Sequence, residues 1–170
     1  MLAALALGVP FAALAAAGGA KSGQAQRAIS LWPTSATPAI PDAGPDRPVE
    51  LGVRVRTDVP GHVLGVRFYK AAANAGKHFV HLWTADGEML ARASPRAESP
   101  SGWQRADFPR PVSIEPGKVY VASYHAPAGH FSVDYGEFAA RGVDRAPLHA
   151  AADGPAGPNG AFGYGPAGTF

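Results

Sequence analysis

The chain contains no cysteine among its 170 residues. Disulfides, thiolate metal ligands and thiol nucleophiles are therefore excluded, and stability has to come from packing and hydrogen bonds. The length allows this, because a domain of about 150 residues buries roughly two-thirds of the surface of its unfolded chain. Charge of one sign is also scarce: the net charge is +2, and the basic residues are spread among acidic ones. Nucleic-acid binding normally needs clustered Lys and Arg, so we expect no nucleic-acid partner.

Helical periodicity is missing as well. No stretch of ten or more residues after position 29 repeats its apolar residues with a helical period. Glycine and proline are abundant instead, with 21 and 17 residues and no collagen-like period. Frequent glycine and proline are typical of a protein built from many short elements joined by turns.

The first twenty residues, MLAALALGVPFAALAAAGGA, carry no charged side chain and end in small residues. This pattern predicts a cleaved secretory signal over residues 1–20, followed by a polar linker over 21–28. A membrane anchor is the alternative, but Gly8 and Pro10 interrupt an apolar run that is barely long enough for a bilayer. We therefore expect export, no stable membrane insertion after cleavage, and one domain over residues 29–170.

Alternation with a period of two is the main structural signal after the linker. In VELGVRVRT, residues 49–57, apolar side chains alternate with Glu50, Gly52, Arg54 and Arg56, which places the second set in water. A turn at Pro60-Gly61 leads to a second alternating run, so the two runs are expected to form a hairpin.

Further strands follow at intervals of about ten residues. The Asp86-Gly87 pair predicts a tight hairpin between strands at 78–84 and 88–94, with Phe79, His81 and Trp83 on one face. We expect another strand over 102–114 broken by Pro109 and Pro111, one over 117–125, and a mostly irregular tail with a closing strand near 161–164. The pattern indicates an all-β protein, an antiparallel β-sandwich of jelly-roll type.

Four stretches of the chain resemble, in order, blocks of the bacterial domain-of-unknown-function family 4082. They are SLWPTSATPAIPD, the long run from VELGVRVRT to GEMLA, SGWQRADFPRPVSIEPGKVYVASYHAPAGHFSVD and PLHAAADGPAGPNGAFGYG. The resemblance spans about residues 30–168. It implies a secreted β-sandwich module that usually lies in larger extracellular bacterial proteins, beside immunoglobulin-like or carbohydrate-active domains. No catalytic residues are established for the family, so none are carried over. Because the chain ends at Phe170 without a clear partner domain, we expect a fragment or a minimal member.

Aromatic and imidazole side chains supply the candidate binding residues: Tyr69, His81, Trp83, His125 and His130. Flat rings stack on sugar faces. Phe79 and Trp83 share one strand face with His81 between them, and with Tyr69 on the outer face of the preceding strand they could form a partly exposed row. The alternative is that such aromatics fill the core, which the pattern favours for Trp83 and more strongly for Trp103, Tyr120 and Tyr124.

Catalytic and metal-binding patterns are weak. There is no Gly-x-Ser-x-Gly elbow around Ser123 and no facing carboxylate pair. A histidine metal site would have to join His125, His130 and His149, or use His78 and His81, and the turn between His125 and His130 need not bring their rings together. A structural calcium at Asp86, Asp134 and Asp144 has no spaced carboxylate motif to support it. We therefore predict no catalytic residues, no metal and no cofactor.

The function expected from these observations is that of a non-catalytic extracellular module, secreted or at the bacterial cell surface, that binds polysaccharide or another cell-surface glycan. Two alternatives stay open. One is a structural spacer within a larger secreted protein, and the other is a metal enzyme that uses the histidines.

Overall fold

The computed structural model describes residues 8–10, 28–155 and 157–170, and every regular element in this part of the chain is a β-strand. The predicted signal and linker lie outside the described residues, apart from Gly8–Pro10 and Ala28, and both remain predictions. No helix of the described residues is long and apolar enough to cross a membrane. The strands are β1 (Gly8–Pro10), β2 (Ala28–Ser30), β3 (Val49–Thr57), β4 (Gly61–Lys70), β5 (Phe79–Thr84), β6 (Met89–Ala93), β7 (Gly102–Ile114), β8 (Tyr120–Ala126), β9 (Val143–Arg145), β10 (Leu148–Ala150) and β11 (Gly160–Tyr164).

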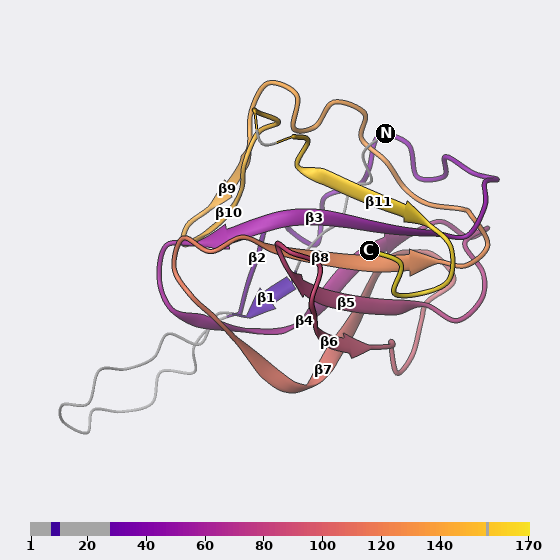
Figure 1. The fold of residues 1–170 in the computed structure, drawn as a ribbon. Helices are drawn as coiled ribbons and strands as arrows, with labels where there is room; N and C mark the ends of the chain where they lie inside the picture. The colour runs from indigo at the N-terminus through magenta and orange to yellow at the C-terminus, as the bar shows by residue number, and fades with distance from the viewer. Residues whose placement is uncertain (1–7, 11–27, 156) are drawn as a thin grey trace.

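The strands form two main antiparallel layers of unequal size (Figure 1). The large layer has the order β6-β5-β8-β3-β10-β9, with β11 also paired to β3. The small layer consists of β4 and β7, and β1 pairs with β2 separately. This arrangement confirms the predicted all-β, antiparallel, sandwich-like fold.

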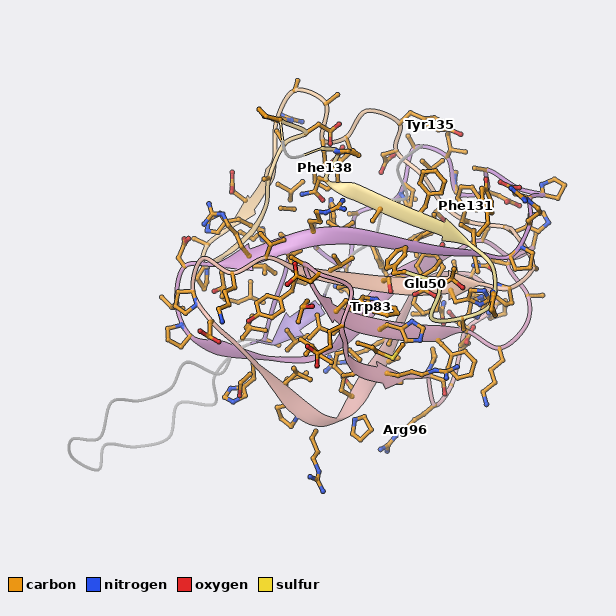
Figure 2. All side chains as sticks on the ribbon, viewed as in Figure 1. Glu50, Trp83, Arg96, Phe131, Tyr135 and Phe138 are labelled. Atoms are coloured by element: carbon orange, nitrogen blue, oxygen red, sulfur yellow. The ribbon has the colours of Figure 1, made fainter. Side chains whose placement is uncertain are left out.

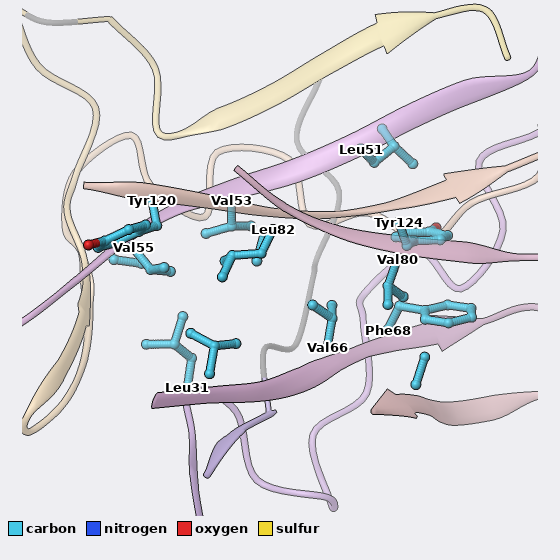
Figure 3. Close-up of a cluster of buried hydrophobic side chains, with 14 of the residues drawn as sticks. Leu31, Leu51, Val53, Val55, Val66, Phe68, Val80, Leu82, Tyr120 and Tyr124 are labelled. Carbon is cyan, nitrogen blue, oxygen red and sulfur yellow. The ribbon is translucent and has the colours of Figure 1, made fainter. Parts of the chain in front are cut away.

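The core lies between the two layers (Figure 3). From the large layer, β3, β5 and β8 contribute the apolar members of their alternating patterns, among them Leu51, Leu82 and Tyr124. Val66 and Phe68 face them from β4, and the rings of Phe68 and Tyr124 stack with centroids 4.6 Å apart. Full burial of one such side chain contributes about 1.5–3 kcal/mol to stability, so period-two alternation is sufficient to fix which face of each strand turns inward.

The expected hairpin between residues 49–57 and 61–70 does not form. β3 pairs with β8, β10 and β11, whereas β4 pairs with β7 in the other layer. The Pro60-Gly61 turn therefore carries the chain across the sandwich, as in jelly-roll connections. The hairpin of β5 and β6 around Asp86-Gly87 is confirmed, and Gly87 has the positive φ of 88° that the turn requires.

Strand β7 runs through the two prolines that were expected to break it. Val63 of β4 is opposite Val112, and Gly65 is opposite Asp107, so residues 108–111 bulge out of the ladder beside Leu64. Pro109 and Pro111 lie in this unpaired stretch, where a missing N–H costs no ladder hydrogen bond.

The tail is more regular than the sequence indicates. β11 confirms the closing strand, but β9 and β10 were expected to be loop. Both are only three residues long, too short for their alternation to be recognised.

Candidate functional site

The outer face of the large layer, which turns away from the core, is covered by residues 165–170, here called the C-terminal segment. The chain leaves β11, turns at Gly165 with a φ of 141°, and returns over β3, β8 and β5 with a second positive φ of 91° at Gly168. Gly52 of β3 makes room for it, because a Cβ there would lie 2.9 Å from a ring carbon of Phe170. The segment places Phe170 against Trp83 of β5, with ring centroids 5.6 Å apart.

Beneath the segment, Glu50, His81, Trp83 and Ser123 form a buried polar cluster, with at most 3% of each residue exposed. Figure 2 shows Glu50 and Trp83 on the large layer. Glu50 Oε1 accepts hydrogen bonds from His81 Nδ1 at 2.8 Å and from Ser123 Oγ at 2.5 Å, and Oε2 accepts one from the backbone N–H of Gly168 at 3.2 Å. Trp83 Nε1 donates to Ser123 Oγ at 2.9 Å. Three strands and the C-terminal segment are thus tied to one carboxylate.

This cluster corrects two expectations. Glu50 and Gly52 do not face water, because the C-terminal segment covers the face of β3 that carries them. Trp83 is buried but lies outside the core between the layers, so neither the exposed aromatic row nor the core position describes it.

The order of groups in the cluster also bears on its chemistry. The carboxylate of Glu50 lies between Ser123 and His81, and the serine donates to the carboxylate. In serine hydrolases an imidazole contacts the serine and takes its proton. The cluster therefore has a geometry suited to joining the strands and lacks the contact that activates a serine.

A groove opens at one end of the same outer face, between the start of β5, the end of β8 and the C-terminal segment. Its volume is roughly 740 Å³, within the usual range of ligand sites. Phe79, His125, Tyr164 and Pro166 are among its lining residues. Phe79 and His125 lie on the outer face of the sheet, whereas Tyr164 is opposite the core residue Val49 in the ladder and also packs against the core. The remaining lining residues are Arg47, Pro48, Lys77, Pro127, Gly165 and Ala167.

Hydrogen bonds fix the walls of the groove. His125 Nε2 donates to the carbonyl oxygen of Gly165 at 3.0 Å, which joins the sheet to the C-terminal segment. Tyr164 Oη donates to Asp46 Oδ2 at 2.7 Å, and this bond is the largest cause of the raised pKa of Tyr164. His125 and Tyr164 are therefore held in place before any ligand arrives, which reduces the ordering cost of binding.

Cations lie over both aromatic walls. The guanidinium carbon of Arg47 is 4.1 Å from the ring centroid of Tyr164. The guanidinium carbon of Arg92 and the Lys77 Nζ lie 3.8 and 5.2 Å from the ring centroid of Phe79. None of these three side chains forms a salt bridge with another described residue. The rings attract the cations electrostatically, and Arg47 also interacts with the Tyr164 hydroxyl and the Asp46 carboxylate.

The residues proposed from the sequence do not form one site. Of the five, only His125 borders the groove, whereas His81 and Trp83 lie in the buried polar cluster. His130 is separate, with Nδ1 2.9 Å from Asp42 Oδ1. Phe79 was expected in the aromatic row but not among the five residues, and Tyr164 and Arg47 were not proposed, because their position in the groove depends on the course of the tail.

Tyr69 lies on the other layer. Its ring is 5.4 Å from that of Trp103, its partner across the β4–β7 ladder, and the two are nearly perpendicular. Arg67 lies over Trp103 at 4.8 Å, and burial lowers the pKa of its guanidinium. Trp103 is only partly buried and donates to the carbonyl of Ala36, so its expected core position is wrong, whereas Tyr120 and Tyr124 are core residues as expected.

His78, His81, His130 and His149 each contact at least one carboxylate, and no group of three or more metal-ligating side chains occurs in the described part of the chain. His149 lies between Asp144 and Asp58, with Nδ1–Oδ1 and Nε2–Oδ2 distances of 2.6 and 2.5 Å. The hydrogen bond to Asp144 is the largest cause of the raised pKa of His149. His78 behaves oppositely: burial lowers its pKa despite the nearby carboxylate of Glu98.

Comparison with known protein families assigns the chain to one of them. The family model described as Domain of unknown function (DUF4082) matches residues 35–170, which include the core strands, the buried polar cluster and the groove. The chain belongs to this family. No curated protein matches it, and no solved structure does. For a DUF4082 domain, the match means that β3 to β11 and the C-terminal segment all lie within the family unit.

Proposed function

We propose that this DUF4082 domain is a non-catalytic, extracellular binding module for polysaccharide or a cell-surface glycan. The observation that carries the proposal is the groove of roughly 740 Å³, whose lining includes the aromatic residues Phe79 and Tyr164, three prolines and the cations Arg47 and Lys77. Sugar-binding sites need this mixture, because the C–H face of a pyranose packs on flat apolar groups while its hydroxyls need hydrogen-bond partners. The apolar stretch at residues 1–20 supports export.

A structural spacer is the second candidate, and the buried polar cluster favours it. Trp83 and His81, two of the ring-bearing residues proposed for binding, are used to hold the C-terminal segment on the sheet. A module whose rings serve only its own stability would suit a spacer. The groove distinguishes the two candidates, because a spacer has no need of it.

The test is isothermal titration calorimetry of the intact protein against a panel of soluble polysaccharides, with pull-down on insoluble ones. Phe79→Ala and Tyr164→Ala should each weaken binding about five- to tenfold, the loss expected for one stacked ring. Tyr135→Ala is the matched control, since Tyr135 is 60% exposed and does not line the groove. Melting temperatures of the variants establish that they are folded. Absence of binding to every polysaccharide would favour the spacer.

A further inference from the structure

We propose that the groove selects acidic glycans, namely polysaccharides whose sugars carry carboxylates or other anionic groups. This inference rests on the proposed function and specifies the class of ligand. It concerns the three cations Arg47, Lys77 and Arg92, which surround the rings of Tyr164 and Phe79.

The charges around the groove are unbalanced. No Asp or Glu of the described residues lines it. At its rim, Asp46 accepts the hydroxyl of Tyr164 and the backbone N–H of Arg47, so two of its acceptor positions are occupied. Glu50 lies opposite His125 in the ladder, but its carboxylate is buried and holds three donors. The charged residues that line the groove are therefore Arg47 and Lys77, both cationic, and the guanidinium of Arg92 lies beside the ring of Phe79.

The nearby acidic side chain of Glu98 does not change this balance. It binds Lys70 Nζ at 2.7 Å and His78 Nδ1 at 2.8 Å. Its charge is thus already paired with a lysine outside the groove. Lys77 and Arg92 form no salt bridge with another described residue, whereas Arg47 interacts electrostatically with Asp46. An incoming anion would therefore meet Lys77 and Arg92 without breaking an existing salt bridge.

The position of the cations also disfavours a neutral sugar. Arg92 covers one approach to the ring of Phe79 and Lys77 lies near the same ring, so a neutral pyranose would have to displace cations from favourable positions. A uronate can pack its C–H groups against proline and Tyr164 while its carboxylate binds the cations where they are. Charge-assisted hydrogen bonds of this kind are roughly twice as strong as neutral ones.

The experiment compares polygalacturonate with its fully methyl-esterified form, two polymers with the same backbone of which only the first is charged. Calorimetry of the intact protein should give at least tenfold tighter binding for polygalacturonate, and the difference should shrink as salt is raised from 50 to 500 mM. Lys77→Gln and Arg47→Gln should each weaken polygalacturonate binding about three- to tenfold. Arg110→Gln removes the same charge at an exposed position outside the groove and should leave binding unchanged.

The outcomes separate the two proposals. Equal or tighter binding of the ester, or preference for neutral members of the panel, would overturn the inference about charge and leave glycan binding standing. Loss of affinity in Arg110→Gln equal to that in Lys77→Gln would place the effect in the overall charge and overturn the role of the groove. If no polysaccharide in the panel binds, acidic or neutral, both proposals fail together.

Discussion

Removal of the Glu50 carboxylate is the sharpest perturbation of this structure. In Glu50→Ala, Ser123 Oγ, His81 Nδ1 and the backbone N–H of Gly168 all lose their acceptor in a place that water does not reach. Each buried donor left without a partner costs about 1–3 kcal/mol. Because three buried donors lose one acceptor, we expect the free energy of unfolding to fall by about 3–5 kcal/mol.

Urea denaturation followed by circular dichroism measures this loss. Glu50→Gln keeps the shape and one carbonyl acceptor, so it should lose less, about 1–3 kcal/mol. Glu88→Ala is the control, because Glu88 is exposed in the β5–β6 turn and its removal should change stability by less than about 0.5 kcal/mol. A loss below about 1 kcal/mol in Glu50→Ala would refute the assignment of Glu50 as the acceptor that joins the sheet to the C-terminal segment.

Three further predictions concern pH, the hairpin and the C-terminal segment. The raised pKa of His149 supplies stability that is present below about pH 6.5 and is lost as pH rises through the folded value, so His149→Gln should destabilise the protein at pH 5.5 and have little effect at pH 8.5. The lowered pKa of His78 acts oppositely, because the folded protein loses stability as pH falls below about 6.5. His78→Gln should therefore make the protein less sensitive to this fall in pH. Urea midpoints across this range check both, and equal effects at both pH values would contradict the shifts. Gly87→Ala should lower the free energy of unfolding by about 1–2 kcal/mol through the positive φ alone, because nothing lies within 4 Å of the added Cβ. Gly154→Ala is the control: this position is equally open but has an ordinary φ, so the same denaturation experiment should show almost no change. Gly52→Ala should lift the Phe170 ring and increase acrylamide quenching of tryptophan fluorescence at a cost of about 1–3 kcal/mol, and unchanged quenching would argue against the packing described.

The strands of this fold could be predicted well from the sequence, but their partners could not. Alternation located β3, β5 and β8 to within a few residues, and Asp86-Gly87 fixed one hairpin because a short primed turn leaves no other pairing. The turn at Pro60-Gly61 has no such constraint. Whether it joins two strands of one sheet or crosses to the other layer is decided by the packing of β4 on β7, a contact between distant parts of the chain.

The same reason explains why the candidate site was only partly found. Glu50, His81 and Ser123 were each visible as polar residues within alternating strands, but only the ladder register brings them side by side. Their burial depends on the C-terminal segment, in which four of the six residues are glycine, proline or alanine and no periodic signal occurs. The sequence therefore predicted that Glu50, a charged residue on the outer face of its strand, is exposed to water, because nothing in the sequence indicates that the C-terminal segment covers this face.

The bulge in β7 has a consequence for the behaviour of the protein in concentrated solution. A thirteen-residue strand paired with only one neighbour in the described structure is a template on which a second molecule could add its own strand. Pro109 and Pro111 prevent this, because they bend the strand and remove two N–H groups in its middle. The two prolines are thus expected to keep separate copies of the molecule from joining edge to edge.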